Sequence, residues 1–402
     1  MSLIAGLLAG ILFFSLLSER LQRSAITLPI FFTALGYGMT QIPDTSIAAL
    51  SDHGMLLTLT EATLVLVLFS DASHVRLRDL WRSAAYPARM LLIAMPLAIL
   101  LGAGVARFMT PEAPWVITLL LAAILAPTDA ALAQAVTSSE KVPARLRRSI
   151  EVESGLNDGL ALPMVLAAAV VAVEVLGVTG AQVPANLGLF TLKQIILGPL
   201  AGIAVGWVAA RALDLAMTTK SISPAYDGLV FLAAAFLAFA VAGAIGGNGL
   251  IAAFVGGLTF GHALRTSTSF ISEFMSAEGK LLTMLSFTIF GAAMVPDGLA
   301  HASWATVGAA VCFLTIVRMG PVWLSLAGTG LRPREKLFLG WFGPRGLASV
   351  LFSLLVLEKF QLPHIEELVA CVVLTVILSV VLHGLSARPL ACLVKDQENN
   401  DA

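Results

Sequence analysis

The chain has 402 residues, of which 58% are apolar and 12% are charged, and its formal net charge is −1. A soluble domain carries roughly 25% charged residues, whereas the mean hydropathy here is +0.91. This composition excludes a soluble globular enzyme, a disordered protein and a nucleic-acid-binding protein, and it predicts an all-α polytopic membrane protein.

Charged and Pro- or Gly-rich breaks divide the chain into about thirteen apolar segments, a number that the length allows at about 20 residues per membrane span. No Lys or Arg precedes the first segment, so we interpret it as a retained helix and not as a signal peptide. In chain order we predict transmembrane helices at residues 2–17, 26–42, 55–71, 86–107, 113–137, 149–175, 188–213, 226–245, 248–263, 279–296, 303–327, 336–357 and 366–388.

The basic residues orient these helices. Of the 24 Lys and Arg residues, eighteen lie in odd-numbered loops or the C-terminal tail, and two lie in even-numbered loops. The positive-inside rule therefore places the N-terminus outside and the C-terminus in the cytoplasm. Of the remaining four, Lys193 and Lys280 lie near helix ends, where their stems reach the interface. Arg318 and Arg345 lie well inside their spans and need partners.

The fifth segment reads LLAAILAPTDAALAQAV and contains a proline at its centre. Pro127 removes a backbone donor and clashes with the preceding turn, so we expect the helix to break near residues 126–128. Thr128 is then expected to cap an inner half-helix, with Asp129 at its positive end. A broken helix at membrane depth is tolerated where it lines a cavity or is buried in protein.

The sixth segment begins IEVESGLNDGLALP and carries several polar residues on one helix face. Glu153 and Asn157 are four residues apart, as are Ser154 and Asp158. Asp158 lies about nine residues, or ~14 Å, from the inner end of the segment, near the bilayer midplane. Its oxygen atoms suit a hard cation such as Na⁺, or a proton. The alternative, a polar seam that joins helices, requires fewer polar groups than this face carries.

Arg318 in the eleventh segment requires an acidic partner inside the membrane. Glu153 is the first candidate, because Asp129 and Asp158 are then left for a ligand. The sequence leaves open the other pairing, Arg318 with Asp158.

The twelfth segment reads FLGWFGPRGLASVLF and predicts a second break. Gly343, Pro344 and Gly346 interrupt the helix, and Arg345 between them can neutralise freed carbonyl ends. With the seventh segment as a connector, segments one to six match segments eight to thirteen, and the two broken segments occupy equivalent places. Two interrupted segments in corresponding halves, which are then inverted repeats, indicate a transporter binding site.

Taken together, these residues resemble the cation:proton antiporter-1 family of sodium/proton antiporters and exchangers. The resemblance rests on separate blocks between about residues 60 and 390, namely VLFSDASHVRLRDL, LAPTDAALAQAV, VESGLNDG, GNGLIAAFVGGLTFG, IVRMGPV and FLGWFGPRGLAS.

The resemblance implies a fold of about thirteen transmembrane helices, with inverted repeats and two broken crossing helices, in a homodimer in the inner (plasma) membrane. Residues 86–175 and 303–390 would form a core domain that moves ions, and residues 1–85 and 226–296 a dimerisation domain. Residues 188–213 would be the connecting helix. The chain ends about a dozen residues after its last predicted helix, so we expect no cytoplasmic regulatory domain.

The resemblance also implies roles for individual residues. Asp158 would bind the cation or the proton, and Asp129, Thr128 and Ser154 would complete the site, with both carboxylates as ligands of the transported Na⁺. Structural support would come from the remaining polar groups, Asn157, Glu153, Arg318 and Arg345. The implied function is antiport of a monovalent cation, Na⁺ first and Li⁺ or K⁺ as alternatives, for H⁺. An Asn before the key Asp further implies electroneutral one-for-one exchange.

Other functions remain as alternatives. A K⁺/H⁺ antiporter would share the same fold, while a cation channel or membrane-embedded sensor would belong to another class and would not couple cation flux to protons. We expect no enzymatic activity and no cofactor beyond the transported ions, because the sequence contains no HExxH motif and no nucleophile–base pair at membrane depth. Glu61 has no role that the sequence assigns.

Overall fold

The computed structural model describes residues 3–23, 26–42, 53–74, 85–178, 186–223, 226–265, 269–360, 362–363 and 365–394. All regular structure in these ranges is helical, as the composition predicts. The elements are α1 (Leu3–Leu16), α2 (Ser18–Arg23), α3 (Leu28–Thr40), α4 (His53–His74), α6 (Ala85–Arg89), η1 (Met90–Ala94), α7 (Met95–Met109), α8 (Trp115–Ile124), α9 (Ala130–Thr137), α10 (Ala144–Leu176), α11 (Leu187–Thr218), α12 (Asp227–Ala244), α13 (Gly249–Ala263), α14 (Ser269–Ile289), η2 (Phe290–Met294), α15 (Val295–Ala300), α16 (Trp304–Leu314), α17 (Ile316–Ser325), α18 (Pro333–Trp341), α19 (Leu347–Phe360) and α20 (Ile365–Leu393).

Each predicted apolar segment contains between one and three consecutive helical elements. By length and composition, seven helical stretches among the described residues can cross a membrane, and four shorter apolar helices accompany them. The number of crossings, thirteen, stays a prediction.

Both predicted helix breaks are present. The fifth segment is interrupted between Ile124, where α8 ends, and Ala130, where α9 begins. The twelfth is interrupted between Trp341, the end of α18, and Leu347, the start of α19. Pro127 and the Gly343–Gly346 stretch lie inside these gaps, in agreement with the loss of a backbone donor and the flexibility of glycine.

Two wide π-helical turns, η1 and η2, each lie just before a proline. The Met95 N–H donates to the Met90 carbonyl, and the Val295 N–H donates to the Phe290 carbonyl. Pro96 and Pro296 follow and have no N–H to continue a normal α-helical ladder, so the wider turn absorbs the mismatch. The prolines are visible in the sequence, but the π turns were not predicted from it.

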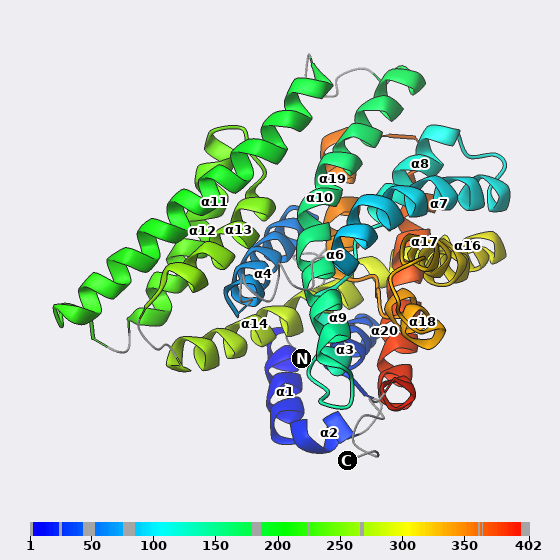
Figure 1. The fold of residues 1–402 in the computed structure, drawn as a ribbon. Coiled ribbons are helices and arrows are strands. Elements are labelled where there is room, and N and C mark those ends of the chain that lie inside the picture. The colour runs from blue at the N-terminus through cyan, green and yellow to red at the C-terminus, as the bar shows by residue number, and fades with distance from the viewer. Residues whose placement is uncertain are drawn as a thin grey trace.

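The helices pack mainly within two groups (Figure 1). The first bundle comprises α3, α4 and α11 to α14, and the second bundle comprises α7 to α10 and α16 to α20. The helix α10 contacts α11 and α13 of the first bundle, and α19 contacts α4. These contacts place α10 and α19 at the boundary between the two bundles. The assignment of moving and dimerisation domains stays a prediction.

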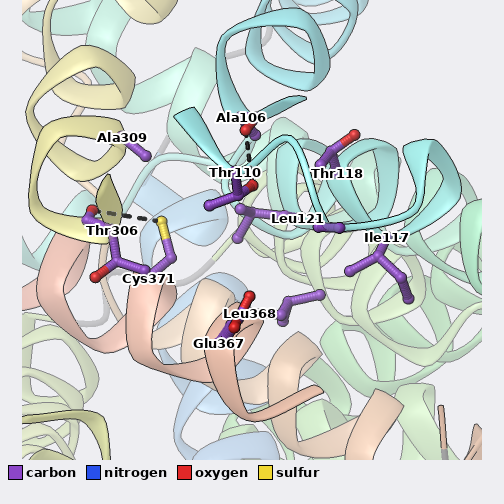
Figure 2. Close-up of a pocket in the computed structure, with 11 residues that line it drawn as sticks. Ala106, Thr110, Ile117, Thr118, Leu121, Thr306, Ala309, Glu367, Leu368 and Cys371 are labelled. Atoms are coloured by element: carbon purple, nitrogen blue, oxygen red, sulfur yellow. Dashed lines mark hydrogen bonds between the residues drawn. The ribbon is translucent and has the colours of Figure 1, made fainter. Parts of the chain in front are cut away.

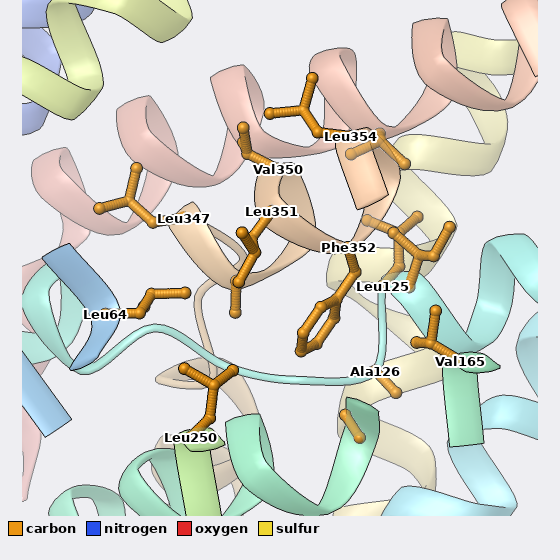
Figure 3. Packing of buried hydrophobic residues seen from close by; sticks show 14 of the residues in the cluster. Leu64, Leu125, Ala126, Val165, Leu250, Leu347, Val350, Leu351, Phe352 and Leu354 are labelled. Atoms are coloured by element: carbon orange, nitrogen blue, oxygen red, sulfur yellow. The ribbon is translucent and has the colours of Figure 1, made fainter. Parts of the chain in front are cut away.

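A layer of apolar side chains fills the space around the fifth-segment break (Figure 3). It includes Leu64 of α4, Leu250 of α13, Val165 of α10 and Phe352 of α19, and all of them are buried. Leu125, at the break itself, is fully buried among them. Because water is excluded from this layer, the polar groups at the break need partners within the protein.

Candidate functional site

The two helix breaks contact each other through Asp129. Its backbone N–H donates to the Pro344 carbonyl over 2.8 Å. Its side chain accepts one N–H from Leu132 at 3.2 Å and one from Leu347 at 2.7 Å. The carboxylate therefore caps α9 and α19 together, where the positive ends of both helix dipoles favour an anion.

This geometry corrects one detail of the sequence-based expectation. Asp129, and not Thr128, caps the inner half-helix α9. Thr128 instead directs its hydroxyl to α10, where it lies 2.9 Å from Ser154 Oγ.

Arg345 provides the opposite charge at the opposite helix end. Its Nη1 donates to the carbonyls of Ala126 at 2.5 Å and Pro127 at 2.8 Å, just beyond the last turn of α8. The side chain is fully buried. The guanidinium of one break thus neutralises the freed carbonyls of the other, as the dipole of α8 requires.

Polar residues of α20 hold the second break in place. Ser379 Oγ accepts the Arg345 N–H at 2.7 Å. His383 places Nε2 2.8 Å from the Trp341 carbonyl, at the end of α18, and Nδ1 2.9 Å from the Ser379 carbonyl. Both side chains are buried. Sequence reasoning missed them, although a Ser and a His four residues apart in an apolar segment was an available signal.

Two glycines of the second break leave room for charged side chains from neighbouring elements. A Cβ on Gly343 would collide with the Arg318 guanidinium, and a Cβ on Gly346 would collide with the Asp129 carboxylate. Neither neighbour can move without giving up buried hydrogen bonds.

Gly346→Ala is therefore expected to displace the Asp129 carboxylate, lower stability by about 1–3 kcal/mol and strongly reduce transport. Thermal unfolding in detergent and proton flux in proteoliposomes measure the two effects. Gly320→Ala is the matched control, because that helical glycine has open space around its Cβ position and should be neutral or mildly stabilised. Equal behaviour of the two variants would contradict the close-approach requirement.

Glu153 and Arg318 form a buried, two-point ion pair. Arg318 Nη1 and Nη2 each lie 2.7 Å from one Glu153 carboxylate oxygen, and the side chains are 2% and 3% exposed. Asn157 Nδ2 donates to Thr128 Oγ1 at 2.6 Å and lies 3.4 Å from Glu153 Oε1. A continuous polar network thus joins α17, α10 and the fifth-segment break.

Asp158 lies beside this network without joining it. The residue is 3% exposed, and its Oδ1 accepts no hydrogen bond from the part of the chain that the structure describes. The carboxylates of Asp129 and Glu153 are close enough to repel it electrostatically. A buried carboxylate in this position calls for a positive charge or a proton.

The charges of the buried site do not balance. Glu153 is paired with Arg318. Asp129 accepts an N–H at the start of α19, and Arg345 donates to a carbonyl after the end of α8. Three acids therefore face two guanidinium groups, and the unpaired negative charge falls on Asp158. A single bound monovalent cation or a single proton would neutralise it.

Two exposed acidic residues lie near the buried site. Asp71 on α4 and Glu151 on α10 are exposed, and Asp71 is within electrostatic range of both Glu151 and Asp129. Further along α10 the helix packs so closely on α13 that a Cβ on Gly155 would collide with the Phe254 ring. Exposed carboxylates such as Asp71 and Glu151 attract cations to this part of the molecule.

Glu61, which the sequence left without a role, is half-buried on α4. It is attracted electrostatically by Lys359 at the end of α19. The two residues come from different bundles, so this attraction spans the boundary between them.

A small pocket lies at the ends of α7, α8, α16 and α20, away from the helix breaks (Figure 2). The hydroxyls of Thr110, Thr118 and Thr306 line it, but each donates to a carbonyl of its own helix or cap. The rest of its lining is mostly apolar. Glu367 contributes a carboxylate to the lining, whereas the three threonine hydroxyls are already engaged.

Comparison with known proteins gives a match over nearly the whole chain. Residues 1–392 match the family model for the transmembrane part of the sodium/hydrogen exchanger. The chain is 24% identical over 385 residues to the K⁺/H⁺ antiporter NhaP2 of Shewanella oneidensis, covering 94% of this chain and 65% of that protein. It is 27% identical over 394 residues to the K⁺/H⁺ antiporter NhaP of Alkalimonas amylolytica, covering 97% and 66%.

A third relative, the Na⁺/H⁺ antiporter NhaH of Halobacillus dabanensis, is 25% identical over 298 residues, with 71% of each protein covered. The chain spans about two thirds of the length of the two K⁺/H⁺ relatives. The fold matches the sodium proton antiporter MjNhaP1 from Methanocaldococcus jannaschii with a TM-score of 0.74 at 21% identity, covering 96% of this chain and 97% of that one.

Proposed function

Because the chain belongs to the sodium/hydrogen exchanger family, we propose that it exchanges a monovalent cation for protons across the membrane. The observation that carries this proposal is the buried Asp158 carboxylate, whose Oδ1 has no hydrogen-bond donor among the described residues. A cation and a proton would compete for this carboxylate, and the occupied site would then be exposed to the other side by alternating access.

The remaining predicted site residues take supporting parts in this proposal. In this proposal the Thr128 and Ser154 hydroxyls, which lie 2.9 Å from each other, would line the approach to Asp158, and Asp129 would contribute negative charge while it caps two helices. Asn157, with the ion pair described above, fixes Thr128 in place. Arg345 holds the break together. The transported ion thus meets a preformed oxygen-lined site.

Exchange of one cation for one proton follows from the charge balance. With one unpaired carboxylate, the site is neutral when it holds either a cation or a proton, and it carries one negative charge when empty. Moving that charge through the apolar layer costs several kcal/mol. The empty site therefore crosses slowly, and exchange is favoured over leak.

The chain is a multi-pass membrane protein. We propose a bacterial inner membrane as its location, with the N-terminus outside and the C-terminus in the cytoplasm, because basic residues concentrate in alternate loops. Asp71 and Glu151 would then mark the cytoplasmic approach. Exposed apolar side chains of α11, among them Leu192, Ile196 and Trp207, offer a surface for lipid, and the proposed homodimer would form through residues 1–85 and 226–296.

The identity of the cation is Na⁺ in our primary proposal and K⁺ in the alternative, since the relatives include antiporters named for each ion. Proton flux in proteoliposomes, measured against gradients of Na⁺, Li⁺ and K⁺, decides between them. The assay is run with and without an imposed membrane potential. Cation flux without proton movement would indicate a channel, and a potential-dependent exchange rate would contradict one-for-one stoichiometry.

The pH dependence follows from competition for one carboxylate. Where Asp158 is mainly protonated, a drop of one pH unit on the cation side should raise the KM for the cation about tenfold and leave the maximal rate on that side unchanged, because the ligand must be deprotonated to bind. Initial rates at several cation concentrations and pH values measure this. A KM that does not move with pH would show that cation and proton use separate sites.

A further inference from the structure

A carbonyl next to the proposed ion-binding residue lacks the usual hydrogen-bond donor four residues further along its own helix. Pro163 lies inside the continuous helix α10 and has no N–H. The carbonyl four residues earlier, that of Gly159, therefore cannot receive its usual intrahelical hydrogen bond. Gly159 directly follows Asp158 and is buried. An unsatisfied carbonyl in this apolar surrounding would be unfavourable.

Asn248, from the other bundle, supplies the hydrogen bond that the helix lacks here. Its Nδ2 lies 3.4 Å from the Gly159 carbonyl and donates to it. Its Oδ1 accepts the Ile251 N–H at 3.0 Å and so caps α13. This cap fixes which end of the amide faces α10, since only the NH₂ group can donate to the carbonyl. The side chain is 1% exposed.

The backbone of Asn248 is also anchored. Its N–H lies 3.4 Å from the Gln194 carbonyl of α11, and Gln194 Nε2 donates to the Gly246 carbonyl at 3.3 Å. The amide that reaches α10 is thus fixed to α11 and α13 together. A displacement of α10 along α13 must break its bond to Gly159.

We propose that Asn248 is a positioning residue for ion exchange: its amide holds the Asp158 region of α10 against α13 in the conformation described, and releases it when the ion site moves. This inference rests on the proposed function. In this conformation the Gly159 carbonyl is satisfied. In any conformation with α10 displaced along α13, it loses that donor. The hydrogen bond therefore biases the equilibrium toward the conformation in which Glu151 is exposed on the approach to the site.

The test separates this role from simple helix capping. Asn248→Ser keeps a cap acceptor but cannot reach Gly159, so the described conformation loses its advantage. A neutral hydrogen bond of this kind corresponds to about a two- to tenfold change in a conformational equilibrium. We expect the KM for Na⁺ or K⁺, supplied on the side of Glu151, to rise by this factor. The dependence of KM on pH should keep its slope, because Asp158 is untouched.

The decisive comparison is made in a Pro163→Ala background. This substitution restores a backbone N–H that can donate to the Gly159 carbonyl within α10, so removal of the Asn248 amide no longer leaves that carbonyl unsatisfied. There Asn248→Ser should shift the KM by less than about 1.5-fold, well below the range for loss of a neutral hydrogen bond. Equal shifts in the two backgrounds, or no shift in either, would overturn the inference.

Two further variants serve as a replacement for Asn248→Ser and as a matched control. Asn248→Thr retains a cap oxygen on a neutral side chain too short to reach Gly159, and it replaces Asn248→Ser if that variant does not fold. Asn186→Ser is the matched control, since Asn186 caps α11 in the same manner through the Leu189 N–H and is exposed. Absence of antiport in the unsubstituted protein would contradict the proposed function. A working antiporter with equal KM shifts in both backgrounds would contradict only the role of Asn248.

Discussion

Proton flux driven by a cation gradient is expected to fall to the level of empty liposomes when Asp158 is replaced by Asn. The substitution preserves the size of the side chain but removes the one carboxylate of the buried site that neither an ion pair nor a helix end occupies. An amide can neither release a proton nor balance the charge of a bound cation. Dye-quenching flux measurements on reconstituted protein report the loss directly.

Stability distinguishes a chemical loss from a folding defect. Asp158→Asn removes a buried, uncompensated charge, so the variant should unfold at the same temperature as the parent protein or at a higher one. Asp297→Asn makes the same change at an exposed carboxylate on α15 and should leave flux unaltered. Retained cation-dependent flux in a folded Asp158→Asn protein would refute the central role of this carboxylate.

Breaking the buried ion pair is expected to have the largest effect on folding. Glu153→Gln leaves Arg318 without a charged partner at 3% exposure, and removing one member of such a pair typically costs about 3–5 kcal/mol. The same change weakens the contact to Asn157 Nδ2, which orients Thr128. We expect low expression, a markedly lower unfolding temperature in detergent and little residual flux.

A double variant reveals why the pair is needed. Replacing Glu153 and Arg318 together by Met removes both charges, and apolar replacements of buried pairs are often neutral or stabilising. The double variant should therefore unfold at a higher temperature than Glu153→Gln. If the double variant were as unstable as the single one, the cost would come from lost shape or hydrogen bonds and not from an orphaned charge.

Features that depend on local chemistry could be predicted from the sequence. Pro127 and the Gly343–Gly346 stretch indicated both breaks, because each acts on the backbone within one turn. The partner of Arg318 could be narrowed to Glu153 or Asp158, because charges are rare inside the membrane and must find one another. The residues within one helical turn, together with the scarcity of charge in the membrane, were enough to predict the helix breaks and to limit the partners of Arg318.

Features that depend on which segments meet could not be predicted. The sequence indicated an acid at one break and a base at the other, but not that Asp129 would cap α19 or that Arg345 would donate to the carbonyls after α8. Thr128 was wrongly assigned as the cap, since Asp and Thr are both good cap residues and only the position of α10 separates them. The contact between Asn248 and Gly159 links segments 89 residues apart, and no local pattern indicates it.

The glycine face of α10 would limit the positions that this helix can take against α13. Gly155 faces the Phe254 ring and Gly159 faces Ile251, so two bare patches lie one helical turn, or about 6 Å, apart along the axis. Sliding α10 by one turn exchanges one bare patch for the other beneath the same ring, whereas a half-turn would drive a side chain into it. The boundary between the bundles would thus allow two packing positions of α10 against α13. The Asp158 carboxylate would then occupy one of two defined depths in the membrane.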